Sequence, residues 1–338
     1  MSKQNRSVAA VILAAGKGTR MKSQLPKVLH PILGKPMISY ILQACGTAKV
    51  DRTIVVVGYE ADLVREQLGP NFEYVKQIQQ LGTGHALLMA SEALKGYSGD
   101  ILVLAGDTPF LTGRFLKQLV QRHQQTGAAA TLTTAILDPT PAYGRIIRNK
   151  SGRVLRIVEE RDATIKERKI TEVNTSHYCF QAEKVLPLLA QLDQNNDQGE
   201  YYLTDVIQML TDRNQLVETF TVKDPEILIG INSRKELTRA ALKMKDAILE
   251  KMMEHGVTII DPASIYIEPD VKIGLDTTIN PFTMLQGKTR IGKDCSIGPH
   301  VRLSNATIGN GCSIEFAVVS ERKIKDGETI GPFASITG

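Results

Sequence analysis

The sequence predicts an α/β domain with a mostly parallel sheet, then a connecting helix and a short parallel β-helix. Three observations lead to this fold class. β-branched runs alternate with helix-like segments through about residue 230, residues 233–255 keep one helical pattern, and a six-residue repeat follows. A chain of 338 residues is also longer than an average single domain. We therefore predict domains at residues 1–232 and 256–338, joined by a linker helix over 233–255.

The α/β part is predicted from strands that alternate with helices. Several of the strands are apolar throughout, as expected where helices cover both faces of a sheet. The predicted strands are residues 9–13, 53–57, 101–104, 129–136 and 178–180, and the predicted helices are residues 37–47, 61–68, 84–94, 112–125 and 204–210. Because such sheets bind ligands at the carboxyl ends of their strands, we expect functional residues directly after strands.

Residues 233–255 are rich in Lys, Arg, Glu, Met and Leu, and Gly256 is a plausible end for this helix. Six basic residues lie along it, and we interpret them as a solvated face; a binding surface is the alternative. They are Arg234, Lys235, Arg239, Lys243, Lys245 and Lys251.

The final part of the sequence has a period of six residues. Small or β-branched residues lie two positions before most of the repeated residues, and glycine often follows them. The repeated residues are Ile267, Ile273, Ile279, Leu285, Ile291, Ile297 and Leu303, then, after a slip of one, Ile308 and Ile314, and finally Ile324, Ile330 and Ile336. This period is typical of a solenoid in which each flat side of a coil contributes one inward aliphatic residue. Because the pattern continues to Gly338 without a polar cap, we expect a β-helix that is truncated or capped by a partner.

Composition and charge exclude several classes of protein. Hydrophobic residues at 42% and charged residues at 23% are ordinary for a globular chain, and no apolar run approaches the roughly 18 residues of a membrane span. The apolar residues 8–15 lead into a basic, glycine-rich segment, which is unlike a signal-peptide cleavage region. We therefore expect a cytoplasmic protein without membrane insertion. The four cysteines are too sparse for a disulfide scaffold.

The first chemical motif is a glycine-rich loop directly after the first strand, at the place where a backbone cradle for phosphate is expected. Met21 stands where the dinucleotide fingerprint requires its third glycine, and the Walker A pattern is absent. A tight turn would also explain the glycines alone. Arg20 and Lys27 favour a cradle, because two cations beside exposed N–H groups suit a triphosphate. The net charge of +5 agrees with a small anionic substrate but is too small to indicate nucleic-acid binding.

Leu13-x-x-Gly16-x-Gly18-Thr-Arg20-Met21, with Pro26-Lys27 downstream, resembles the signature loop of sugar-phosphate nucleotidyltransferases. With the later helix and hexapeptide repeat, the whole chain resembles the bifunctional N-acetylglucosamine-1-phosphate uridylyltransferase/glucosamine-1-phosphate acetyltransferase family. The resemblance implies a Rossmann-like nucleotidyltransferase domain followed by a left-handed β-helix. It also implies a homotrimer assembled through that β-helix.

The resemblance assigns roles to residues at matching positions. It implies that Arg20 and Lys27 are catalytic and that Mg²⁺ is bound by Asp107 and Asn232. The implied nucleotide-binding residues are Leu13, Ala14, Ala15, Gly16, Gly18, Lys27, Gln77, Gly82 and Thr83, and the implied sugar-phosphate-binding residues are Gly144, Glu159, Asn174 and Asn232. Taken alone, the strand-end Asp107 could be a helix cap and Thr83 a helix start. Residues 199–205 match the segment that flanks the sugar site in the family.

The implied reaction joins UTP to N-acetylglucosamine 1-phosphate, releasing pyrophosphate and giving UDP-N-acetylglucosamine for cell-envelope precursors. It needs no side-chain nucleophile, because the attacking phosphate is already ionised; positioning and charge neutralisation suffice. Two departures from the family occur. Ser176 stands where the family usually has glycine, and the acetyl-transfer residues belong to later coils than those present. We therefore expect uridylyl transfer without acetyl transfer.

Other functions remain as alternatives. Another nucleotidyltransferase, making ADP-glucose or dTDP-glucose, could share these modules, and the segments around Gln77 and residues 200–205 argue against it. A non-catalytic regulatory subunit would tend to lose the phosphate-binding cations and the metal ligand, whereas Lys27 and Asp107 are present. A pure hexapeptide acyltransferase lacks its site here.

Overall fold

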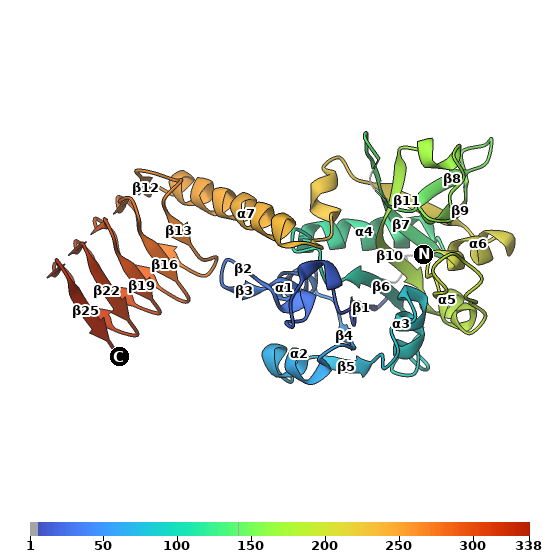
Figure 1. Ribbon diagram of the computed structural model, residues 1–338, viewed down its shortest axis with the longest axis horizontal. Helices are drawn as coiled ribbons and strands as arrows, with labels where there is room; N and C mark the ends of the chain where they lie inside the picture. Colours follow the sequence, from blue (N-terminus) through green and yellow to red (C-terminus); the bar gives the residue numbers. More distant parts are fainter. Residues whose placement is uncertain (1–5, 141) are drawn as a thin grey trace. The chain divides into compact units, whose positions relative to one another are not determined.

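The computed structural model describes residues 6–140 and 142–338 (Figure 1). Within these residues, the chain divides into two compact units. The first unit extends to Asn232 but excludes the short segment Pro31–Lys35. That segment belongs with the second unit, which otherwise consists of Ser233–Gly338. The described ranges contain no helix with the length and apolar character that crossing a membrane requires.

The first unit is built on a mixed, mostly parallel sheet. In the described part of the unit its main path runs β11-β7-β10-β6-β1-β4-β5. The neighbours β6, β1, β4 and β5 are parallel, as are β11 and β7, whereas β10 is antiparallel to both β6 and β7. These strands are β1 (Val8–Ala14), β4 (Arg52–Val57), β5 (Glu73–Lys76), β6 (Asp100–Ala105), β7 (Ala130–Ile136), β10 (Glu172–Gln181) and β11 (Val217–Thr221). The predicted α/β class is therefore confirmed.

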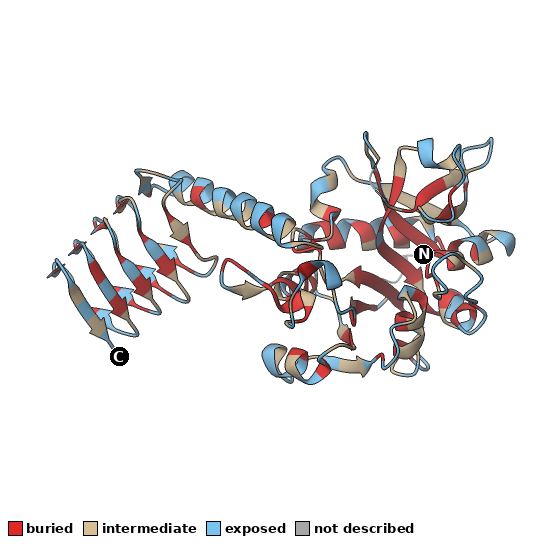
Figure 2. Ribbon diagram, in the orientation of Figure 1, coloured by how far each residue is buried: buried red, intermediate tan, exposed pale blue. Residues whose placement is uncertain are grey.

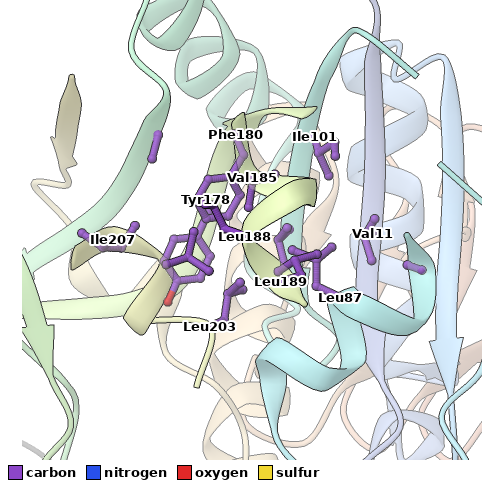
Figure 3. Close-up of a cluster of buried hydrophobic side chains, with 14 of the residues drawn as sticks. Val11, Leu87, Ile101, Tyr178, Phe180, Val185, Leu188, Leu189, Leu203 and Ile207 are labelled. Atoms are coloured by element: carbon purple, nitrogen blue, oxygen red, sulfur yellow. The ribbon is translucent and has the colours of Figure 1, made fainter. Parts of the chain in front are cut away.

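Helices cover both faces of this sheet, as the apolar strands predict. Alternate residues of β1 enter different cores: Ala10 and Ile12 pack with one set of helices, Ala9 and Val11 with the other. Figure 3 shows the second core, where Val11 lies among side chains of β6, β10 and the covering helices. The first set is α1 (Met37–Ala48), α2 (Ala61–Leu68) and α4 (Gly113–Thr126), and the second is α3 (Thr83–Ala90), α5 (Ala182–Leu189) and α6 (Asp205–Asp212).

Several elements differ from the prediction for local reasons. The predicted helix over residues 84–94 ends at Ala90 and continues as turns. Helix α5 was not predicted, because Pro187 within it is unfavourable in a helix interior and interrupts the helical pattern of the sequence. Strand β10 is ten residues long rather than three. Its first part was not predicted, because Ser176 has a left-handed backbone (φ 60°) and the pairing with β7 shifts between Asn174 and Tyr178, which breaks the alternation of side chains. The antiparallel pair β8 (Arg145–Arg148) and β9 (Val154–Val158) was also not predicted.

The second unit begins with α7 (Arg234–Glu254). Ser233 caps its first turn by accepting a hydrogen bond from the Glu236 amide, and the helix surface is largely exposed (Figure 2). Ala240 and Leu249 are its buried residues, and Leu249 joins the core of the following β-helix. The hairpin strands β2 (Pro31–Ile32) and β3 (Lys35–Pro36) contribute Lys35, whose Nζ lies 2.7 Å from Asp270 Oδ1.

The rest of the second unit is a parallel β-helix of the hexapeptide class. Its described strands form three parallel sheets, and the repeated aliphatic residue is the second residue of most strands. The first sheet holds β12 (Thr258–Ile259), β15 (Thr278–Ile279), β18 (Ser296–Ile297), β21 (Ser313–Ile314) and β24 (Thr329–Ile330). The second sheet holds β13 (Tyr266–Ile267), β16 (Met284–Gln286), β19 (Arg302–Ser304), β22 (Ala317–Ser320) and β25 (Ala334–Thr337). The third sheet holds β14 (Lys272–Ile273), β17 (Arg290–Ile291), β20 (Thr307–Ile308) and β23 (Lys323–Ile324).

The β-helix core explains the gap in the sequence repeat. Between Ile314 and Ile324 the pattern has no isoleucine or leucine at the expected place, and fully buried Val319 fills that position. The residues two positions earlier in the repeat, such as Thr277 and Cys295, are buried as well. The six-residue period therefore predicts the inward residues correctly, and the left-handed hexapeptide β-helix that the family resemblance implies is confirmed.

Candidate active site

The first unit contains a cleft of about 410 Å³ at the carboxyl ends of β1 and β6. This is the place where a parallel α/β sheet presents loop residues to a ligand. The glycine-rich loop, the end of β6 and the segment before α6 all contribute to its wall. The lining residues include Leu13, Ala14, Ala15, Gly16, Lys27, Gln77, Gly82, Thr83, Asp107, Glu159, Ser176, Tyr178, Gln198, Glu200, Tyr202 and Thr204.

The glycine-rich loop lies against the lysine that follows it. Gly18 has φ 67°, and a Cβ added there would collide with the side chain of Lys27. Glycine at this position therefore permits both the left-handed turn and the close approach of Lys27. Arg20 lies on the short 3-10 turn Thr19–Met21, where it is exposed and is not among the residues that line the cleft. The structure thus brings Lys27, but not Arg20, to the cleft wall.

Lys27, Asp107 and Asn232 converge although they are far apart in the sequence. The Lys27 ammonium forms a salt bridge with Asp107 Oδ2 and donates a 3.0 Å hydrogen bond to Asn232 Oδ1. The Ile231 amide donates to the Asp107 carbonyl oxygen at 2.9 Å, which ties the segment before Asn232 to the end of β6. The Lys27 and Asp107 side chains are only 17% and 15% exposed, so their charges interact with little screening.

The same two oxygens fit a magnesium ion. A carboxylate and an amide oxygen are hard ligands of the kind Mg²⁺ prefers, and Mg²⁺ usually takes only one or two protein ligands beside phosphates and waters. Both oxygens lie within bonding distance of one cation, the Lys27 ammonium. The described residues hold no group of three His, Cys, Asp or Glu side chains that could bind a metal by themselves. A metal here would therefore complete its shell with substrate oxygens.

Two sequence motifs meet at the side of the cleft where Gln77 lies. Gln77 is buried, and its Nε2 donates to the Gly82 carbonyl oxygen at 3.1 Å. Gly82 has φ 103°, and a Cβ there would lie 2.7 Å from the Tyr201 carbonyl oxygen. Thr83 Oγ1 accepts a hydrogen bond from the Leu203 amide at 3.2 Å. The segment around Gly82 is therefore held against residues 200–203, with the Gln77 side chain fixed between β5 and α3.

The predicted sugar-binding residues gather around Glu159, which lines the cleft beside Thr204. Glu159 Oε1 accepts a 3.0 Å hydrogen bond from Thr204 Oγ1. The Gly144 carbonyl oxygen accepts from the Asn174 amide at 2.8 Å, and a Cβ on Gly144 would approach the Glu159 carboxylate. Burial raises the pKa of Glu159 above its ordinary value. Gly144, Asn174 and Glu159 thus lie together, although only Glu159 lines the cleft itself.

Residues in and beside the cleft wall that were not assigned individually also contribute. Tyr178 is buried, and its hydroxyl accepts a 2.7 Å hydrogen bond from Asn174 Nδ2. Gln198 Nε2 donates to the Tyr202 hydroxyl at 2.8 Å. Burial and neighbouring carboxylates raise the pKa of Asp205 from 3.8 to about 6. The alternation along β10 could have identified Tyr178 as a partner of Asn174, but the bulge at Ser176 breaks it.

The chain is similar to known nucleotidyltransferases over most of its length. Residues 9–226 match the family model of nucleotidyl transferases. The bifunctional protein GlmU of Geobacillus thermodenitrificans is 47% identical over 327 residues, which cover 97% of this chain and 71% of that protein. The bifunctional protein GlmU of Brevibacillus brevis is 44% identical over 329 residues, with the same coverage of both chains.

A third relative agrees with these two. The bifunctional protein GlmU of Caldanaerobacter subterraneus is 45% identical over 329 residues, covering 97% of this chain and 72% of that protein. Identity at this level extends through both the α/β unit and most of the β-helix, and it confirms the resemblance found in the sequence. The chain is a nucleotidyltransferase enzyme and belongs to the bifunctional GlmU family.

Proposed function

We propose that this enzyme transfers UMP from UTP to N-acetylglucosamine 1-phosphate, with Mg²⁺, giving UDP-N-acetylglucosamine and pyrophosphate. The observation that carries the proposal is the convergence of Lys27 and Asp107, which line the cleft, with Asn232, which is hydrogen-bonded to Lys27. Enzymes of this type generally use a divalent metal, and these oxygens suit one. Family membership supports uridylyl transfer as the reaction, and we place it in the cytoplasm, in the synthesis of cell-envelope precursors.

The cleft residues would act by position and charge. A phosphate oxygen of the sugar phosphate attacks the α-phosphorus of UTP, forming one P–O bond as the bond to pyrophosphate breaks. Lys27 would neutralise charge on the phosphates in a partly desolvated site. Asp107 and Asn232 would hold Mg²⁺, which supplies further neutralisation of the triphosphate when bound. Arg20 does not line the cleft in this structure, and we propose that it contributes a second cation to the phosphates when substrate is bound.

Two groups of residues at the cleft would select the two substrates. Gln77 and the backbone at Gly82 and Thr83 are proposed to bind uracil, because side-chain and backbone amide groups can match the polar edge of a base. Gly144, Glu159 and Asn174 are proposed to bind the sugar of N-acetylglucosamine 1-phosphate. The raised pKa of Glu159 means that sugar hydroxyls could offset its burial by donating hydrogen bonds.

A substrate panel tests this proposal. The protein is incubated with Mg²⁺, each of the four common nucleoside triphosphates and several sugar 1-phosphates, and pyrophosphate release is measured. We expect release with UTP and N-acetylglucosamine 1-phosphate to exceed the other combinations by at least about tenfold. A preference for ATP or dTTP would instead identify an ADP-glucose or dTDP-glucose type of enzyme and overturn the proposal.

We further propose that the coils described here do not acetylate glucosamine 1-phosphate. His300 is the histidine of this β-helix, and its ring stacks between Phe282 and Phe316 at centroid distances of 4.9 and 5.2 Å, which suits packing rather than base catalysis. Thiol release from acetyl-CoA by this 338-residue polypeptide should stay at background. Substantial turnover would contradict this part of the proposal.

A further inference from the structure

A second polar centre lies behind the cleft, and the proposed reaction does not use it. His177, on β10, is fully buried, and its Nε2 lies 3.0 Å from Thr108 Oγ1. Thr108 is only 2% exposed and directly follows Asp107 in the chain. The Thr108 hydroxyl donates to the Ala105 carbonyl oxygen at 2.9 Å. Because a hydroxyl carries one proton, it accepts from His177, so His177 donates through Nε2.

This contact belongs to a buried network across three strands. The His177 carbonyl oxygen accepts from Thr133 Oγ1 of β7 at 3.0 Å, and Thr133 Oγ1 lies 2.5 Å from Thr175 Oγ1 of β10. Thr175 Oγ1 also donates to the Thr133 carbonyl oxygen at 3.0 Å. The network lies at the bulge where β10 changes register against β7. It therefore connects the bulged strand of the sugar side with the turn that carries Asp107.

We propose that His177 is a positioning residue for the metal site: by hydrogen bonding Thr108 it fixes the turn that aims the Asp107 carboxylate into the cleft. The inference rests on the proposed function, because it concerns the ion that Asp107 and Asn232 would hold. A fixed turn matters since Mg²⁺ tolerates little deviation from octahedral geometry. Groups that orient a metal ligand commonly change metal affinity 10–100-fold when they are removed.

The protonation state of His177 agrees with a hydrogen-bonding role. Burial lowers its pKa from 6.5 to about 4, so the ring is neutral throughout the pH range of ordinary assays. A neutral imidazole can keep the single donation to Thr108 without bringing a charge beside the metal site. Replacing His177 by leucine should therefore weaken Mn²⁺ retention by the same factor at pH 6 and at pH 9.

The experiment measures metal retention apart from turnover. Enzyme is titrated with Mn²⁺ and UTP, without sugar phosphate, and bound Mn²⁺ is followed by the enhancement of water proton relaxation. His177→Leu should weaken Mn²⁺ retention by about tenfold and lower kcat, with KM for N-acetylglucosamine 1-phosphate within about twofold of the original. His177→Gln, which returns a donor at similar reach, should recover most of the retention.

His123→Leu is the matched control. His123 is buried to a similar degree, and its Nδ1 lies 2.9 Å from Thr131 Oγ1, so it is another buried histidine–threonine pair. It has no contact with the turn at Asp107 among the hydrogen bonds of the described residues. This variant should lose thermal stability to a similar extent while keeping its Mn²⁺ retention.

The outcomes separate this inference from the proposed function. If Asp107→Asn leaves Mn²⁺ retention and turnover unchanged, the proposed metal site fails whatever His177 does. The positioning role is overturned if Asp107→Asn loses Mn²⁺ but His177→Leu retains it. In that outcome His177→Leu would only have a lower melting temperature, as the His123→Leu control does. Should His177→Leu fail to fold, Thr108→Val removes the same link from the other side, and unchanged retention in that variant would equally overturn it.

Discussion

At the scale of single residues, the site depends on charges that the fold holds together. Lys27 comes from the loop after β1, Asp107 from the end of β6 and Asn232 from the end of the first unit, and hydrogen bonds link all three. The sequence could identify each residue by its motif but could not show that Lys27 bridges the two metal-ligand candidates. That contact depends on the strand order, which places β6 beside β1.

Lys27→Ala should lower turnover about 10²–10³-fold, because it removes one preorganised cation from the phosphates. Lys17→Ala is the control: Lys17 lies in the same loop but is exposed, with its Nζ over the Tyr59 ring. Steady-state rates of pyrophosphate release compare the two variants. Near-full activity of Lys27→Ala would place the phosphate-binding cation elsewhere.

Asp205→Asn should stabilise the enzyme at neutral pH. The folded state raises the pKa of Asp205 from 3.8 to about 6, so the folded protein binds this proton more tightly than the unfolded chain does. The free energy of unfolding therefore falls as the pH rises from about 3.8 to about 6. After allowance for solvent screening, the ionised group costs about 1 kcal/mol at pH 7.5, or about 2–4 °C in melting temperature. Thermal melts should show this gain at pH 7.5 and a clearly smaller one at pH 4, where the folded protein still carries the proton; an equal gain at both would refute the assignment.

At the scale of secondary-structure elements, the periodicity of the sequence predicts the regular elements and misses those whose pattern is interrupted. The six-residue repeat identifies the inward residues of the β-helix because every coil buries the same position. Strand β10 shows the opposite case, since Ser176 adopts a left-handed backbone that places successive side chains out of alternation. Tyr178 was not assigned to the site for this reason, whereas Ser176 was noted only as a departure from the family. Helix α5 was missed because Pro187 and its short length weaken its pattern.

Ile297→Ala should destabilise the β-helix by about 2–5 kcal/mol, because Ile297 is fully buried and the stacked coils above and below it cannot collapse into the cavity. Ser296→Ala, on the exposed face of the same strand, should change stability by less than about 0.5 kcal/mol. Urea denaturation followed by circular dichroism measures both. Equal effects of the two substitutions would contradict the assignment of the inward face.

At the scale of the whole molecule, each unit has its own hydrophobic core, and the residues proposed for catalysis lie in the first unit. The nucleotidyltransferase unit contains every residue proposed for uridylyl transfer, from Leu13 to Asn232. The β-helix carries an exposed aromatic column in which Phe282, His300 and Phe316 stack from coil to coil and Phe333 lies tilted against Phe316. The division at residues 232 and 233 was expected from the change of periodicity, and we keep it as the proposed domain boundary.

We propose that the β-helix assembles three copies of the chain, as the family resemblance implies. Sedimentation velocity over a range of concentrations should show a trimer, in exchange with monomer because the interface has few coils. A stable dimer, or a monomer at all concentrations, would contradict this proposal. The result would leave the uridylyl-transfer proposal untouched, since its site lies within one unit.

The most direct test of the uridylyl-transfer proposal follows the transferred group itself. UTP labelled at the α-phosphate is incubated with N-acetylglucosamine 1-phosphate and Mg²⁺, and the products are separated. The label should appear in UDP-N-acetylglucosamine with the original enzyme and fall about 10²–10³-fold with Asp107→Asn. Label that never enters a sugar nucleotide, or enters it equally well after Asp107→Asn, would contradict uridylyl transfer at this cleft.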